Sequence, residues 1–166
     1  MGGVLVVHNR YVSSSPSGEN DVVDEEIALL QAAGRLVHTY IRSSDEITSS
    51  SRMAKVALAT SPTYAHRAST ELGRIIDQRQ PDVLHLHNPF PLISPWVVRL
   101  AAAKGVPIVQ TVHNYRHVCV SGSLFRDGRV CEDCVGRTVG WPAIAHGCYR
   151  GSRAQSVPMV FSQAVH

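Results

Sequence analysis

The chain has 166 residues, of which 44% are hydrophobic and 17% charged, so it can bury the core of one domain but is too short for two full α/β domains. The net charge is only +3 and no Lys/Arg block alternates with aromatic residues, which argues against nucleic acid and favours phosphate-bearing small molecules as ligands. No apolar run approaches the roughly 18 residues of a membrane span, and residues 1–8 are too short and uncharged for a signal peptide, so we expect a cytoplasmic protein with no membrane span.

Predicted strands and helices alternate along residues 4–114. Apolar runs predict strands at 4–8, 36–41, 83–86 and 107–114, all buried in a sheet. Apolar residues at helical spacing predict helices at 21–33 and 65–76, the pair Ser94 and Pro95 predicts the start of a helix that runs to 104, 42–52 is expected to be a loop, and 53–59 could form a short helix. This alternation predicts an α/β fold with a doubly wound parallel sheet.

The serine-rich loop at residues 9–20 contains Gly18. We expect Gly18 to permit a tight turn whose backbone comes close to a ligand. The loop lacks the GxGxxG pattern of dinucleotide-binding folds, which disfavours a nicotinamide-dependent dehydrogenase.

Three of the predicted strands end on the same dipeptide, a histidine followed by an asparagine. The pairs are His8 and Asn9, His87 and Asn88, and His113 and Asn114. The carboxyl ends of parallel strands share one edge of a sheet, and ligands bind in the crevice outside that edge. A single pair could simply satisfy backbone groups of the loops. Three pairs together favour a ligand site, in which His113 ranks first because its strand leads directly into a cysteine-rich segment.

Residues 115–149 break the alternation of strands and helices. They contain all four cysteines and five glycines and show little helical periodicity, so we expect a loop-rich insertion. Cys131 and Cys134 form a CxxC pair, with eleven residues between this pair and Cys119 and thirteen between it and Cys148. Four thiolates at these spacings predict a closed, structural zinc site.

Other uses of these cysteines remain open. A redox CxxC is one alternative, although such a pair normally opens a helix, and disulfides or unliganded thiols are others. His117 and His146 are close enough in sequence to replace one cysteine as a zinc ligand. Residues 152–166 predict a last helix that Ser152 caps and that Pro158 should kink or shorten.

Five segments of the sequence carry a family resemblance: SPSGEN, PDVLHLHNPFPLIS, GVPIVQTVHNYRHVC, FRDGRVCEDCVGR and HGCYRGSRAQS. With them, nearly the whole chain resembles the N-terminal domain of family 4 glycosyltransferases, which are retaining, sugar-nucleotide-dependent enzymes of GT-B architecture. The last two segments look like a bacterial subgroup that carries the cysteine insertion. The resemblance implies a Rossmann-like fold and a hexosyltransferase-type activity.

In such enzymes the N-terminal domain mostly binds the acceptor and a second domain holds the nucleotide-sugar donor. The resemblance implies that Gly18 lies near the donor diphosphate and that His113 is the catalytic residue, lining the cleft near the transferred sugar. To these the strand-end argument adds four substrate-binding candidates: Asn114, His87, Asn88 and Arg116. The chemistry is not expected to need a catalytic metal, so the zinc would be structural.

The donor-binding domain is missing from these 166 residues, so we expect a truncated chain that is inactive alone. Surface left by that domain, including Phe90 and Leu92, could promote a homodimer of the fragment. The competing hypothesis is a non-catalytic Rossmann-like binding module with a structural zinc site.

Overall fold

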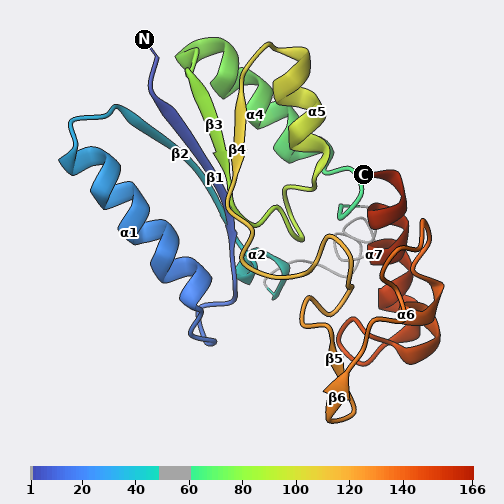
Figure 1. Cartoon of the computed structure of the whole chain (residues 1–166). Coiled ribbons are helices and arrows are strands. Elements are labelled where there is room, and N and C mark those ends of the chain that lie inside the picture. Colours follow the sequence, from blue (N-terminus) through green and yellow to red (C-terminus); the bar gives the residue numbers. More distant parts are fainter. Residues whose placement is uncertain (1, 49–60) are drawn as a thin grey trace. The chain divides into compact units, whose positions relative to one another are not determined.

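The computed structural model describes residues 2–48 and 61–166 of the chain (Figure 1). It divides into two compact units, Met1–His113 and Asn114–His166, which are described separately. The short helix expected at 53–59 lies outside the described residues.

The first unit is built on a four-stranded parallel sheet. Its strands are β1 (Val4–Arg10), β2 (Val37–Ser43), β3 (Val83–Leu86) and β4 (Ile108–Gln110), in the order β2-β1-β3-β4. All three pairings are parallel, with Val7 opposite Tyr40 on one side of β1 and opposite Leu86 on the other. The predicted Rossmann-like α/β fold is therefore confirmed.

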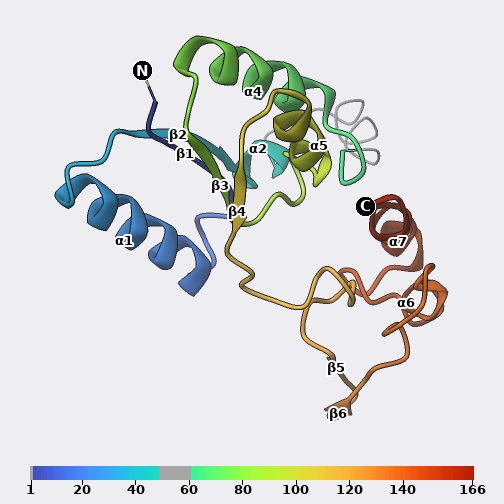
Figure 2. The ribbon, with the colours of Figure 1, turned by 45° about the horizontal axis from the view of Figure 1, so that its top comes forward.

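Helices cover both faces of this sheet (Figures 1 and 2). Helix α1 (Gly18–Ala32) lies against one face, and α4 (His66–Arg79) and α5 (Trp96–Ala103) lie against the other. The side chains of a strand alternate between the two faces, so the sheet can present different chemistry to each.

The main apolar core lies on the face of α4 and α5. Leu5 and Val7 of β1 join Leu84 and Leu86 of β3 there, packed against apolar side chains of the two helices such as Leu72. Because side chains alternate, the residues one position further along each strand face α1 instead. Toward the carboxyl ends of the strands, that second face carries the histidines.

Several predicted boundaries shift. Helix α1 begins at Gly18 rather than at residue 21, and β2 continues to Ser43 and is followed by a four-residue helix, α2 (Asp45–Thr48), where we predicted only loop. The ion pair between Arg42 and Glu46 supports that turn. Ser94 is not an N-cap: its φ is 69°, and α5 starts at Trp96 after Pro95.

The last predicted strand is the largest difference in the sheet. Residues 107–114 were expected to form one buried strand, but β4 covers only Ile108–Gln110. Val109 is 54% exposed and Val112 is 62% exposed. The reason is the position of β4 at the edge of the described sheet, where one side of the strand has no partner.

Phe90 and Leu92, expected on an exposed surface, are instead buried, which removes them as a reason for dimerisation.

The second unit contains the cysteines. A hairpin of β5 (Phe125–Arg126) and β6 (Arg129–Val130) precedes the CxxC pair, and two helices follow, α6 (Trp141–His146) and α7 (Arg153–Val165). Ser152 caps α7 as predicted, with its hydroxyl accepting from the Gln155 N–H at 3.3 Å. Pro158 does not shorten this helix, which runs on for seven further residues. Across both units, none of the helices that the structure describes has the length and hydropathy to cross a bilayer.

Candidate functional site

Four histidines of the first unit share the face that α1 covers. The side chains of His8 on β1, His85 on β3, and His87 and His113 just beyond the ends of β3 and β4 alternate away from the α4–α5 core. Helix α1 lies across them and contributes polar groups of its own. The sheet thus gathers at one edge the three histidines of the strand-end argument, together with His85, which that argument did not name.

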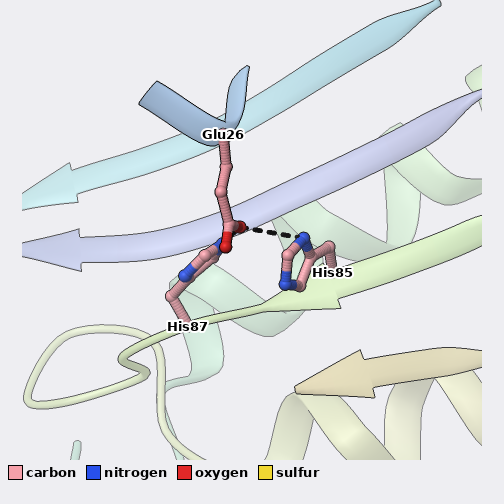
Figure 3. Close-up of side chains that lie close together, drawn as sticks. All are labelled: Glu26, His85 and His87. Atoms are coloured by element: carbon pink, nitrogen blue, oxygen red, sulfur yellow. Dashed lines mark ion pairs between the residues drawn. The ribbon is translucent and has the colours of Figure 1, made fainter. Parts of the chain in front are cut away.

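His87 is the centre of this group, and Figure 3 shows how it lies with His85 and Glu26. Its ring stacks on that of His113, with the ring centroids 5.2 Å apart, and its Nδ1 lies 2.9 Å from Nε2 of His113. Its Nε2 faces Glu26 Oε2 of α1 at 3.3 Å, and the same carboxylate oxygen lies 3.5 Å from Nδ1 of His85. Nε2 of His85 in turn contacts the Thr111 hydroxyl at 2.8 Å.

The environment keeps His87 uncharged. Its side chain has no exposed surface, and this burial, followed by the charges that His85, His113 and His8 can carry, lowers the pKa of His87 to about 3. Burial likewise lowers the pKa of His8. At neutral pH His87 therefore carries a single ring proton.

The position of that proton follows from the partners of the ring. Oε2 of Glu26 and Nε2 of His87 lie 3.3 Å apart, and neither has a hydrogen-bond partner among the described residues, so the contact is electrostatic rather than a hydrogen bond. A carboxylate beside this nitrogen favours the proton of His87 on Nε2, which leaves Nδ1 as an acceptor. The hydrogen bond at 2.9 Å then requires His113 to donate from its Nε2. In neutral His113, Nδ1 is consequently unprotonated and can accept a hydrogen bond. We call this arrangement of Glu26, His87 and His113 the Glu–His–His relay.

His8 is not part of the Glu–His–His relay and instead links two segments of the first unit. It is fully buried, its Nε2 lies 3.0 Å from Oδ1 of Asn20 on α1, and its Nδ1 accepts from the Asn88 N–H at 3.4 Å. His8 thus joins the start of α1 to the loop after β3. Glu19, one residue earlier on α1, accepts from the Asn88 side-chain amide at 3.4 Å and strengthens the same junction.

Two of the asparagines hold loops, which is the simpler alternative that the sequence left open. Asn9 donates to the Ser44 hydroxyl at 3.0 Å and accepts from the Leu92 N–H at 3.3 Å, and Oδ1 of Asn88 accepts from the Phe90 N–H at 3.0 Å. Both asparagines are buried.

Of the remaining predicted binding residues, Asn114 and Arg116 form hydrogen bonds with residues close to them in the sequence, and Gly18 begins a helix. In the second unit, Oδ1 of Asn114 accepts from the Arg116 N–H at 2.9 Å, and the Arg116 guanidinium donates to the Val120 carbonyl at 3.2 Å. In the first unit, Gly18 is the first residue of α1, has no left-handed φ, and would meet nothing within 4 Å if it carried a Cβ. The tight turn expected at Gly18 is therefore wrong, although open space does adjoin it.

Sequence reasoning missed Glu26 and His85. His85 could have been found from the two-residue period of a strand, which puts it on the same face as His87. Glu26 lies three residues after the buried Val23, so helical spacing puts both on the face of α1 that meets the sheet. Among the described residues, Glu26, His85 and His87 are the group whose possible metal-binding atoms all lie within 4.8 Å of one another, and the shared carboxylate suits proton sharing equally well.

All four cysteines of the second unit line one cavity of about 240 Å³, and none forms a disulfide. His146 lines it too, with Nε2 3.4 Å from a carboxylate oxygen of Asp133. His117, the other histidine considered as a ligand, is not among the lining residues.

Comparison with known proteins gives one match. Residues 17–161 match the model of a family described as "Glycosyl transferase 4-like domain". No curated protein and no solved structure gives a significant match. The matched range runs from the start of α1 into α7, so it includes Glu26, His87, His113 and the cysteine cavity.

Proposed function

Because the chain belongs to the glycosyl transferase 4-like family, we propose that it is the acceptor-side domain of a retaining enzyme of GT-B architecture. The enzyme moves a sugar from a nucleotide diphosphate to an acceptor hydroxyl, and a second Rossmann-like domain holds most of the donor. The acceptor oxygen bonds to the anomeric carbon as the bond from that carbon to the diphosphate breaks, and the acceptor proton leaves with the diphosphate. The reaction needs groups that orient the hydroxyls and groups that stabilise the departing charge.

The observation that carries this proposal is the Glu–His–His relay at the carboxyl edge of the sheet. Ligands of open α/β sheets bind outside that edge. The relay leaves Nδ1 of His113 as an acceptor nitrogen on a half-buried ring. In our proposal this nitrogen accepts a hydrogen bond from a sugar or acceptor hydroxyl, while Glu26 and His87 act as positioning residues that fix the ring and its tautomer. His113 does not act as a nucleophile.

A donor diphosphate near the start of α1 is the second part of the proposal. Helix α1 has 15 residues, its N-cap Ser17 makes no side-chain cap, and the space beside Gly18 is open. Backbone N–H groups at such a terminus favour anions. Glu19 and Asp21 in the first turn oppose this, so most of the charge stabilisation is assigned to the second domain.

The test is an assay of a protein that contains this chain together with the proposed second domain. We would incubate it with a panel of uridine, guanosine, adenosine and thymidine diphosphate sugars and candidate acceptors, and measure release of nucleoside diphosphate. His113→Ala should lower kcat by about a hundredfold, since loss of one positioned hydrogen-bonding group in a transition state has effects of this order. His66→Ala, which removes an exposed histidine of α4, is the matched control.

Two outcomes would contradict the proposal. Activity that is unchanged in His113→Ala would show that the relay does not serve the reaction. Binding of a sugar nucleotide or glycan without any turnover would instead favour the alternative of a non-catalytic binding module.

A further inference from the structure

The cavity of the second unit brings together residues that the proposed transferase reaction does not use. Cys131 and Cys134 follow the β5–β6 hairpin, Cys148 follows α6, and Cys119 precedes the hairpin, yet all four line the same cavity of about 240 Å³. We propose that these four thiolates bind one zinc ion, and that this ion holds residues 114–166 in their folded form.

The ligand set suits zinc. Each thiol releases its proton on binding, and four thiolates around one Zn²⁺ form the closed tetrahedral site that serves structure rather than catalysis. Zn–S bonds of about 2.3 Å set the sulfurs roughly 3.8 Å apart. Among the described residues no three cysteine sulfurs lie within 4.8 Å of one another, so zinc binding would draw at least one pair in any three closer by at least about 1 Å.

Polar groups around the cavity match the charge of such a site. Four thiolates and one Zn²⁺ carry a net charge of −2, which nearby donors and cations can offset. The Ser121 hydroxyl lies 3.1 Å from Sγ of Cys119. Arg126 lines the cavity, and its Nε is buried without a hydrogen-bond partner among the described residues. A thiolate at Cys131 or a neighbouring cysteine would give this donor an acceptor.

The second unit also needs a cross-link on grounds of size. Among its described residues the fully buried hydrophobic side chains are few and mostly small: Val120, Ala143, Met159 and Val160. Phe125, Trp141 and Phe161 are each more than half exposed. Units of about 50 residues with so small an apolar core usually depend on disulfides or a metal. The four cysteines are free thiols, and a metal ion bound by them would supply such a cross-link.

The first experiment is metal analysis of the full chain purified under reducing conditions without added zinc. We expect about one zinc per chain, thiols that react only after chelation, and strong thiolate-to-metal absorption when cobalt replaces zinc. Metal-free protein whose four thiols react freely, or which forms a disulfide between Cys131 and Cys134, would overturn the proposal.

The second experiment tests whether the metal folds the unit. Hydrogen exchange measured by mass spectrometry, with and without a zinc chelator, should show protection lost in 114–166 and retained in the first unit, and restored when zinc is added back. Unchanged protection in 114–166 after complete zinc removal would overturn the folding role. Because this comparison uses the unaltered chain, it does not depend on any variant folding.

Variants then define the ligand set. Cys148→Ser should reduce bound zinc to well below one per chain, whereas Val135→Ser, an exposed change to serine beside the CxxC pair, should leave it unchanged. His146→Ala should also retain the zinc. Loss of zinc in His146→Ala with retention in Cys148→Ser would overturn the four-thiolate set.

Discussion

At the scale of single residues, the candidate site depends on where the ring protons of His87 and His113 lie. Buried His87 carries one proton, the nearby carboxylate of Glu26 favours that proton on Nε2, and His113 then donates through its own Nε2. This series of contacts explains how Glu26 on α1 can affect His113, which it does not touch. It also identifies Glu26 and His87 as positioning residues, because the nitrogen proposed to contact a hydroxyl belongs to His113.

Replacing Glu26 by Gln should disturb the tautomer of His113. A side-chain amide can either donate to or accept from His87 Nε2, so it no longer dictates where the proton of His87 lies. Nitrogen chemical shifts of the His113 ring should change from a single tautomer to a mixture, and kcat of the complete enzyme should fall about tenfold with little change in KM. Glu25→Gln, an exposed neighbour on α1, is the control. Unchanged ring shifts of His113 would rule out the relay.

Buried His87 should also make the first unit sensitive to acid. Its pKa is about 3 in the folded chain and about 6.5 when unfolded, so between these values the unfolded state binds the extra proton. The stabilisation is present above pH 6.5 and is lost progressively as the pH falls toward 3. Between pH 7 and pH 5 the contribution of His87 to the free energy of unfolding should fall by about 2 kcal/mol.

Denaturant unfolding at the two pH values measures this loss. His87→Gln should lower the dependence on pH even if it destabilises the protein at both values, whereas His66→Gln, an exposed histidine on α4, should not. Equal pH dependence in wild type and His87→Gln would contradict a neutral, buried His87.

At the scale of elements, the position of α1 connects the sheet to the site. The helix packs Val23 on the sheet and presents Glu26 to the histidines from the same face, while Asn20 bonds to His8 at 3.0 Å. These contacts fix where the first turn of α1 lies relative to the ends of β1 and β3. Gly18 opens that turn, beside open space.

Gly18→Ala should test the proposed donor site at the start of α1 without destabilising the helix. Gly18 has no left-handed φ and no atom within 4 Å of a built Cβ, so alanine should leave the free energy of unfolding unchanged or raise it by a few tenths of a kcal/mol. If a donor diphosphate approaches here, KM for the donor should rise several-fold because the added methyl group takes up that space. Gly34→Ala, at a φ of +71°, should instead destabilise by about 1 kcal/mol. A normal donor KM in Gly18→Ala would contradict this placement of the donor.

At the scale of the whole molecule, the chain combines two units of different kinds. The first has a continuous apolar core between its sheet and α4 and α5, whereas the second has few buried hydrophobic residues and four converging cysteines. Such a difference implies that the two units would respond separately to removal of the proposed zinc. It also bears on activity, because no Lys or Arg side chain is among the described contacts of the relay.

We therefore expect the 166 residues alone to show no sugar transfer. The departing diphosphate needs cations or aligned N–H groups, and the described contacts of the Glu–His–His relay supply neither. Assaying this chain beside a protein that also contains the proposed second domain, with the same donors and acceptors, measures the difference. Turnover by the 166 residues at a comparable rate would disprove the need for a second domain.

The amino-acid sequence by itself determined the order of elements and the edge at which chemistry gathers. Apolar runs and helical spacing are local properties, so they revealed β1, β3, α4 and the alternation that makes a parallel sheet. The three His–Asn endings pointed to the carboxyl edge for the same reason. The cysteine spacing predicted a zinc site, which stays a prediction, and all four cysteines do line one cavity.

The tertiary structure determined the role of each of those residues. Whether a polar side chain at a strand end satisfies a loop, as Asn9 and Asn88 do, or meets another ring, as His87 does, depends on what lies opposite it. The edge position that leaves Val109 exposed and ends β4 early is likewise set by neighbours. Glu26 reaches His87 only because α1 packs across the sheet, and contacts between residues distant in sequence leave no local pattern from which they could be read.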